Sequence, residues 1–180
     1  MIKVRIGGWA GQGTVLAGTV LGRSLALQQG YDVVQRRSYS AAVRSGIAYS
    51  DIIADSVEVN DLTIEVPDYL LILYQKTLDE WDNEVKLCKN LIVDSTRVKK
   101  VKKTDGNIYE VPAGQIAEDI ASSKAANIVL LGALARVCED IDLEGLVDTI
   151  KSEFPKKYKQ MNVEAVKAGY AYIEDLLTKG

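Results

Sequence analysis

The sequence of 180 residues contains no histidine and only two cysteines. Without histidine the chain lacks the usual general base, the Ser-His-Asp and Cys-His nucleophile systems and the commonest metal ligand, so hydrolase and zinc-enzyme interpretations lose most of their support. Cys88 and Cys138 lie fifty positions apart, which gives neither a CxxC redox pair nor the grouped thiolates of an iron–sulfur cluster. We therefore expect two reduced thiols in a cytoplasmic protein.

Long apolar runs and a strong charge of either sign are also absent. No stretch approaches the roughly 18 uncharged apolar residues of a membrane-spanning helix, and the segment Met1–Arg5 lacks the apolar core of a signal peptide. Lys and Arg number 22 against 25 Asp and Glu, a net charge of −3, which is too small to attract nucleic acid or anionic lipid by a general field. We expect no nucleic acid or membrane partner, and any bound anion requires a local site.

The remaining composition is that of an ordinary globular protein. Apolar residues make up 47% of the chain and charged residues 26%, close to the average for folded soluble chains and unlike disordered ones. A length of 180 residues suits one core, because cores stop growing as single units only near about 250 residues. Since no repeat, linker or low-complexity tract divides the chain, we expect a single domain spanning 1–180.

Apolar runs separated by glycines and polar turns predict alternating strands and helices. The unbroken run Leu70-Leu71-Ile72-Leu73 is typical of a strand covered on both faces. The first strand, the following helix and the next strand form a βαβ-type unit, for which we expect a right-handed parallel pair. The pattern predicts an α/β fold: a three-layer sandwich with a Rossmann-like, mostly parallel sheet and helices on both faces. We expect strands at 2–6, 31–35, 46–54, 68–74, 90–94 and 108–111, a return strand at 57–60, and helices at 14–29, 78–89, 112–120, 127–139, 143–154 and 162–177.

A glycine-rich segment lies between the first strand and the first helix. Free backbone N–H groups and the positive end of a helix dipole meet there, which favours binding of a phosphate. The segment departs from the dinucleotide pattern G-x-G-x-x-G because Leu16 takes the third glycine position, and it lacks the Lys-Ser or Lys-Thr of a P-loop. A tight turn and close helix packing would also explain the glycines. The candidate ligand-binding residues of the segment are Gly8, Gly11, Gln12 and Gly13.

Two arginines end the second predicted strand. Arg36 and Arg37 are expected at the carboxyl edge of the sheet, where open α/β sheets bind ligands and where the glycine-rich segment also lies. Each guanidinium can grip a phosphate with paired hydrogen bonds. Solvation, or contact with carboxylates of a partner chain, is the alternative interpretation of both residues.

The residues after the first strand, the polar segment after the second strand and two stretches in the last third of the chain resemble a known protein family. This family consists of the gamma subunits of 2-oxoacid:ferredoxin oxidoreductases, of the pyruvate and 2-oxoglutarate type. A Tyr-Gly-x-Glu-x-Arg-Gly-Gly run is frequent in that family, whereas this chain has Ser40, Ala42 and Ser45 where a Gly, the Glu and the first paired Gly would fall. The resemblance spans nearly the whole chain and rests on residues 8–13, 38–46, 49–53, 127–134 and 162–165.

The resemblance implies one subunit of an assembly that oxidatively decarboxylates a 2-oxoacid, attaches the acyl group to coenzyme A and reduces ferredoxin. It implies alpha, beta and ferredoxin-like partner subunits, with thiamine diphosphate and the iron–sulfur clusters in those other chains. This chain is then expected to hold the phosphate-bearing end of coenzyme A and to help cover the thiamine site. The backbone amides of residues 11–13 with Arg36 and Arg37 are the main candidate ligands, Arg44 and Asn127 are weaker ones, and no catalytic residue is assigned.

Two other functions are consistent with the same residues. The chain could be a purely structural subunit whose glycine segment and arginines meet partner chains and bind no ligand. It could also be an autonomous NADP-binding reductase, with Arg36 or Arg37 on the 2′-phosphate and Tyr39 as a proton donor. The sequence does not select among pyruvate, 2-oxoglutarate, branched-chain and indolepyruvate oxidation, although the short, freestanding chain favours 2-oxoglutarate or a generic 2-oxoacid.

Overall fold

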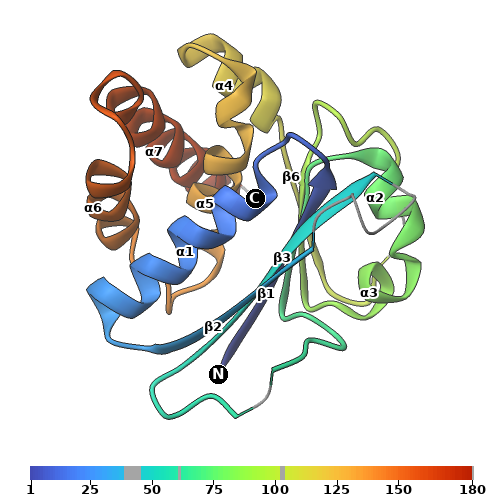
Figure 1. The fold of residues 1–180 in the computed structure, drawn as a ribbon. Coiled ribbons are helices and arrows are strands. Elements are labelled where there is room, and N and C mark those ends of the chain that lie inside the picture. The colour runs from blue at the N-terminus through green and yellow to red at the C-terminus, as the bar shows by residue number, and fades with distance from the viewer. Residues whose placement is uncertain (39–45, 61, 102–103, 180) are drawn as a thin grey trace.

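The computed structural model describes residues 1–38, 46–60, 62–101 and 104–179, in which one sheet lies between two layers of helices (Figure 1). The strands stand in the order β2-β3-β1-β4-β5-β6. β1, β4, β5 and β6 are parallel neighbours, whereas β3 is antiparallel to both β1 and β2. The predicted α/β sandwich with a mostly parallel sheet is confirmed. The strands are β1 Ile2–Trp9, β2 Asp32–Ser38, β3 Ile47–Asp55, β4 Tyr69–Ile72, β5 Asn90–Asp94 and β6 Asn107–Val111.

The predicted pairing of the first two strands is wrong, because β3 lies between them. β1 and β2 still run in the same direction, since each is antiparallel to β3. Most of β3 is buried, as a central strand requires, while β2 carries Asp32, Arg36 and Arg37 and forms the edge. Charged side chains are typical of edge strands because they discourage pairing with other chains. The expected return strand at 57–60 is also wrong: Val59 packs in a small cluster with Ile53 instead of pairing.

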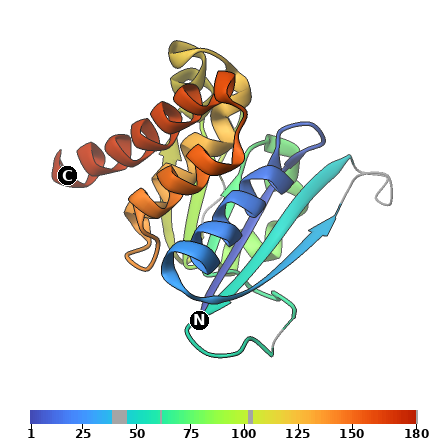
Figure 2. The ribbon, with the colours of Figure 1, turned by 60° about the vertical axis from the view of Figure 1, so that its left-hand side comes forward.

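Helices cover both faces of the sheet unequally. The larger layer packs on one face, where α6 lies between α1 and α7 (Figure 2). The predicted helix at 78–89 is two short helices broken at Trp81, and these form the other layer. The larger layer consists of α1 Thr14–Gln29, α4 Ala113–Ile120, α5 Ala126–Val137, α6 Leu143–Glu153 and α7 Lys156–Lys179, and the smaller one of α2 Gln75–Glu80 and α3 Asp82–Leu87.

Both faces of β4 are buried, as its apolar run predicts. Leu71 and Leu73 join the core under the larger helix layer, whereas Leu70 and Ile72 pack against α2 and α3. Helix α1 comes close to the sheet because it carries glycine at position 18, where a Cβ atom would collide with the Ser50 side chain. This close approach sets the position of the segment that joins β1 to α1.

An ion pair is buried beneath the smaller helix layer. Arg5 on β1 donates from Nε and Nη2 to the two carboxylate oxygens of Asp51 on β3, at 2.7 and 2.9 Å. The rings of Tyr49 and Trp81 lie 5.5 and 5.6 Å from the guanidinium carbon. Burial is the largest single effect and lowers the pKa of Arg5, but the hydrogen bond to Asp51 and the charges of Asp51 and Glu84 together outweigh it, so the pKa of Arg5 is raised. The pair ties β1 to β3 just below the glycine-rich segment.

Candidate functional site

The carboxyl ends of β1 and β4 form the point where the chain connections diverge. After β1 the chain enters α1 in the larger helix layer, and after β4 it enters α2 on the opposite face. β1 and β4 are parallel neighbours in the sheet. In open α/β sheets ligands bind outside the carboxyl ends of the strands at such a divergence, so the fold places its default binding site at the glycine-rich segment.

Gln12 fixes the glycine-rich segment to the end of β4. Its Oε1 accepts a hydrogen bond from the Trp9 backbone N–H at 2.6 Å, and its Nε2 donates to the Leu73 carbonyl at 3.1 Å. A Cβ atom at Gly8 would lie 2.7 Å from Gln12 Oε1, so glycine makes room for this bridge. The side chain of Gln12 is thereby used to shape the segment, and its backbone N–H donates to the Trp9 carbonyl at 3.1 Å.

Asn127, at the start of α5, locks the start of α1. Its Nδ2 donates to the Gly13 carbonyl at 2.9 Å, and its Oδ1 accepts from the Ile128 N–H at 3.0 Å. Gly13 has φ 74° and Gly11 has φ 91°, a left-handed backbone that favours glycine. Asn127 is only 3% exposed. The structure therefore brings Asn127 to the predicted site, where it positions the segment through its side-chain bonds.

A cleft of about 100 Å³ opens directly beside the segment. Two basic side chains that the sequence analysis did not select, Arg97 and Lys124, line it. Arg97 follows β5, and its Nη1 donates to Asp94 Oδ2 at 2.9 Å. The signal that could have found Arg97 is its place just after a buried strand ending in an aspartate, at the same edge as the glycines. The described lining is Gly11, Gln12, Leu73, Arg97, Ser123, Lys124 and Ala126.

The structure does not bring Arg36 and Arg37 to one point. Neighbouring residues of a strand point to opposite faces of the sheet. Arg36 donates to the Leu62 carbonyl at 3.2 Å, whereas Arg37 lines a groove against α1 and donates to Gln35 at 3.2 Å. Both lie on β2, two strands away from β1. Arg44, like Tyr39 and Ser40, lies outside the described residues.

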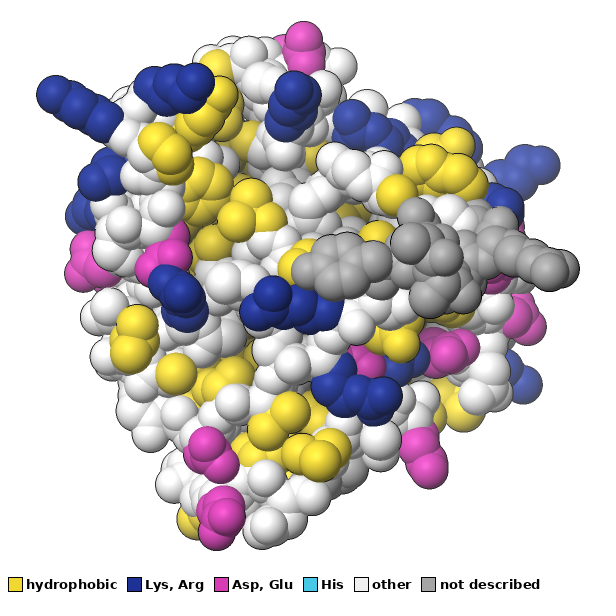
Figure 3. All heavy atoms as spheres, in the orientation of Figure 1, with side chains coloured by type: hydrophobic (Ala, Val, Ile, Leu, Met, Phe, Trp, Pro, Cys, Tyr) yellow, Lys and Arg dark blue, Asp and Glu magenta, His cyan; other side chains and the backbone are white. Residues whose placement is uncertain are grey.

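An aromatic pair with a nearby cation stands at the same edge of the sheet. The rings of Trp9 and Tyr74 lie 5.6 Å apart, and Lys76 Nζ lies 5.1 Å from the centre of the Trp9 ring. Both aromatic residues remain partly exposed, at 37% and 38%. Lys and Arg side chains gather along the upper edge of the view in Figure 3, the end of the molecule where the glycine-rich segment lies in Figure 1. Partly exposed Trp and Tyr side chains are typical of protein interfaces.

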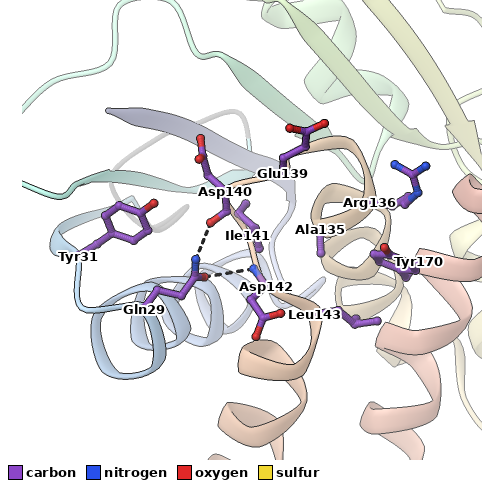
Figure 4. A pocket seen from close by; sticks show the side chains of 10 residues that line it. All are labelled: Gln29, Tyr31, Ala135, Arg136, Glu139, Asp140, Ile141, Asp142, Leu143 and Tyr170. Carbon is purple, nitrogen blue, oxygen red and sulfur yellow. Dashed lines mark hydrogen bonds between the residues drawn. The ribbon is translucent and has the colours of Figure 1, made fainter.

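A larger hollow at the opposite edge has a different character. It measures about 490 Å³, and carboxylates of Glu139, Asp140 and Asp142 line it (Figure 4). Gln29 spans it from the end of α1, donating to the Asp140 carbonyl at 2.6 Å and accepting from the Asp142 N–H at 3.2 Å. The described lining of this hollow thus holds three carboxylates and the guanidinium of Arg136, whereas that of the cleft at the glycine-rich edge holds two cations and no carboxylate.

We next consider metal-binding groups and cysteine thiols in the part of the chain that the structure describes. No group of three His, Cys, Asp or Glu side chains could hold a metal ion there. Cys88 and Cys138 are buried and form no disulfide, and burial raises the pKa of both thiols. Among the described residues no helix is long and apolar enough to span a membrane.

Comparisons with known proteins give a consistent result. The model of a family described as pyruvate ferredoxin/flavodoxin oxidoreductase matches residues 3–172. The 2-oxoglutarate synthase subunit KorC of Methanocaldococcus jannaschii is 32% identical over 177 residues, covering 97% of this chain and 95% of the relative.

Two solved structures share the fold. The gamma subunit of a keto/oxoacid ferredoxin oxidoreductase from Geobacter sulfurreducens is similar with a TM-score of 0.84 and 26% identity, over 95% of this chain and 97% of that one. The 2-oxoglutarate:ferredoxin oxidoreductase of Magnetococcus marinus, solved with 2-oxoglutarate, coenzyme A and succinyl-CoA bound, gives a TM-score of 0.85 at 20% identity. That match covers 97% of this chain but 31% of the other, so a domain of this fold also occurs within longer chains.

Proposed function

The chain belongs to the pyruvate ferredoxin/flavodoxin oxidoreductase family, and we propose that it serves as the gamma subunit of a 2-oxoacid:ferredoxin oxidoreductase and holds coenzyme A there. The overall reaction cleaves the bond between the carboxylate and the 2-carbonyl of the acid, releases carbon dioxide, and joins the acyl group to the sulfur of the thiol. The thiol proton is released, and the two electrons pass one at a time to ferredoxin. The observation that carries the subunit assignment is a match to gamma subunits along nearly the whole chain, in sequence and in fold.

The glycine-rich segment supports the coenzyme A part of the proposal. Coenzyme A carries a pyrophosphate and a 3′-phosphate, and the segment lies at the start of α1 beside the divergence between β1 and β4, where unpaired helix N–H groups favour an anion. The N–H of Gln12 donates to the Trp9 carbonyl at 3.1 Å, so we assign the phosphate to the amides of Gly11 and Gly13. Gly8, Gln12 and Asn127 hold the segment in shape. The bound coenzyme A of the Magnetococcus marinus relative is consistent with a ligand of this chemistry. Because Arg36 and Arg37 face opposite sides of the sheet, we assign at most one of them to any single phosphate.

The thiol delivery that we propose is a positioning role. A thiol held next to an acyl intermediate reacts as part of one complex, and such positioning lowers a barrier by up to about 7 to 11 kcal/mol in favourable cases. The chain offers no Gly-Asp-Gly thiamine motif and no grouped cysteines. We therefore place thiamine diphosphate and the iron–sulfur clusters in alpha, beta and ferredoxin-like partner subunits. The exposed Trp9 and Tyr74 surface would meet those partners and help cover the thiamine site.

We propose 2-oxoglutarate as the acid, since the Methanocaldococcus jannaschii relative is a 2-oxoglutarate synthase subunit. Two unpaired cysteine thiols fit the reducing cytoplasm, where we propose that the complex works.

Reconstitution with and without this chain tests the proposal. The partner subunits are purified with and without the chain, and ferredoxin reduction is measured with a panel of 2-oxoacids at varied coenzyme A. We expect reduction that depends on coenzyme A only when the chain is present, fastest with 2-oxoglutarate. A purely structural subunit predicts instead that variants of the glycine-rich segment weaken assembly and leave the KM for coenzyme A unchanged. Tight NADP binding by the chain alone would favour an autonomous reductase.

A further inference from the structure

We propose that the cleft beside the glycine-rich segment binds the terminal 3′-phosphate of coenzyme A, with Arg97 and Lys124 as the binding cations and Asp94 as a positioning residue. The inference rests on the proposed function and deepens it. Nothing in the sequence pattern selected these residues, and they enter through their place in the fold: Arg97 follows β5, and Lys124 lies in the short 3₁₀ helix Ser123–Ala125 before α5.

The guanidinium of Arg97 is held in a fixed orientation. Asp94 is fully buried, and its Oδ2 accepts from Arg97 Nη1 at 2.9 Å. Its Oδ1 accepts from the backbone N–H groups of Thr96 and Gly114, both at 3.0 Å. A Cβ atom at Gly114 would lie 2.7 Å from Arg97 Nη1, so glycine makes room for the guanidinium. The carboxylate cannot turn away without losing two backbone bonds, and it therefore keeps Arg97 at the wall of the cleft.

The charge of the cleft suits a phosphate. Two cations and no carboxylate belong to its described lining, and Gly11 contributes backbone. Arginine has five N–H donors, and the bond to Asp94 engages one nitrogen, so the same side chain can also grip a phosphate oxygen. The described lining of the hollow at the opposite edge holds three carboxylates against the single cation of Arg136.

The size of the cleft suits a single phosphate group. About 100 Å³ is enough for one phosphoryl group. A pyrophosphate continues as a chain on both sides and needs an open groove, whereas a monoester is attached through a single oxygen and can enter a small cleft. A monoester carries close to two negative charges at neutral pH; it would meet the positive charge of Lys124 and the guanidinium donors of Arg97, whose charge is shared with Asp94. In coenzyme A that group is the 3′-phosphate, and dephospho-coenzyme A lacks it.

Comparison of the two thiols in the assembled enzyme tests the inference. We expect the wild-type complex to have a kcat/KM about 10- to 100-fold higher for coenzyme A than for dephospho-coenzyme A, as charged hydrogen bonds of about 1.5–3 kcal/mol predict. Arg97→Ala should lower kcat/KM for coenzyme A by a similar factor and leave dephospho-coenzyme A unchanged, so that the preference is lost. Lys124→Ala should remove part of the preference. Arg97→Lys keeps the positive charge but loses the planar guanidinium. Its preference for coenzyme A over dephospho-coenzyme A should lie between those of the wild type and Arg97→Ala.

Two further variants separate the roles. Asp94→Asn keeps the shape of the side chain but weakens its hold on Arg97, and should reduce the preference without changing kcat for dephospho-coenzyme A. Lys151→Ala, on the exposed side of α6 where Lys151 pairs with Asp148, is the matched control for loss of one positive charge and should change neither thiol. Thermal unfolding of each free variant checks that it folds. If Arg97→Ala does not fold, Arg97→Lys is used in its place.

The outcomes distinguish the inference from the proposed function. Equal losses for both thiols in Arg97→Ala, or a wild-type complex that does not discriminate between them, would overturn the 3′-phosphate assignment while coenzyme A binding by this chain stands. If the cleft variants have unchanged kinetics and Gly13→Ala raises the KM for coenzyme A, the 3′-phosphate assignment is likewise overturned while coenzyme A binding by this chain stands. If no variant of either the cleft or the glycine-rich segment changes the KM of either thiol, the proposed function fails together with the inference.

Discussion

Adding one methyl group at Gly13 or at Gly11 tests how the glycine-rich segment is held. Both residues have a positive φ, 74° and 91°, where an alanine is strained by about 1–2 kcal/mol. Their surroundings differ. A Cβ atom at Gly11 meets nothing within 4 Å, whereas one at Gly13 would lie 2.5 Å from Asn127 Nδ2. Only the Gly13 substitution should therefore displace the asparagine.

The expected magnitudes follow from these contacts. Gly11→Ala should cost only the backbone strain, about 1–2 kcal/mol of unfolding free energy. Gly13→Ala should also break the buried bond from Asn127 to the Gly13 carbonyl, which adds about 1–3 kcal/mol, for a total of about 2–5 kcal/mol. In an Asn127→Ala background the obstacle is gone, so Gly13→Ala should cost only the strain again, and the two substitutions should not be additive.

Urea unfolding of the four chains in this cycle, and of Gly11→Ala, measures these values. Circular dichroism gives the free energy of unfolding for each, with equal slopes on urea as the check for two-state behaviour. Equal costs for Gly11→Ala and Gly13→Ala would refute the role given to Asn127, and so would strict additivity of Gly13→Ala with Asn127→Ala.

Three other predictions concern the rest of the molecule. Arg5→Met should lower the free energy of unfolding by about 3–5 kcal/mol in a urea titration, because it leaves the carboxylate of Asp51 buried without its partner; a smaller loss in Arg5→Met with Asp51→Leu would confirm the cause. Trp9→Ala should weaken co-elution with partner subunits in gel filtration at a temperature where the free variant is still folded, since the indole is 37% exposed and otherwise packs on its own chain; an unchanged elution profile would contradict this. Burial raises the pKa of Cys88 and Cys138, so above about pH 8.5 the unfolded chain loses thiol protons that the folded chain keeps, and stability should fall as the pH rises; replacing both cysteines with alanine should flatten that dependence.

Much of the fold could be predicted from local patterns. The glycines after the first strand, the buried run that became β4 and the stop of α1 at Gly30 each depend on short stretches of sequence. The order of the strands could not be predicted in the same way. β3 lies between β1 and β2 because it follows β2 as an antiparallel neighbour. The charges of Arg36 and Arg37 suggest ligand-binding groups in the sequence, but they are equally typical of an edge strand, which β2 is.

The structure brings some of the predicted site residues together and separates others. The glycine-rich segment and Asn127 come together as expected. Arg97 stands eighty-four positions from Gly13 in the sequence, and it reaches the segment because β4 and β5 are parallel neighbours of β1 in turn. The break between α2 and α3 also depends on a contact between distant residues. The Trp81 ring lies over Gly7, where a Cβ atom would collide with it. Such contacts depend on strand order, which the local pattern does not contain.

A structure of the assembled complex with coenzyme A bound tests the central claim most directly. The account predicts the adenylate end of the ligand against the N–H groups of Gly11 and Gly13, with its 3′-phosphate between Arg97 and Lys124. An adenylate end bound elsewhere, with that cleft filled by side chains of a partner subunit, would contradict it.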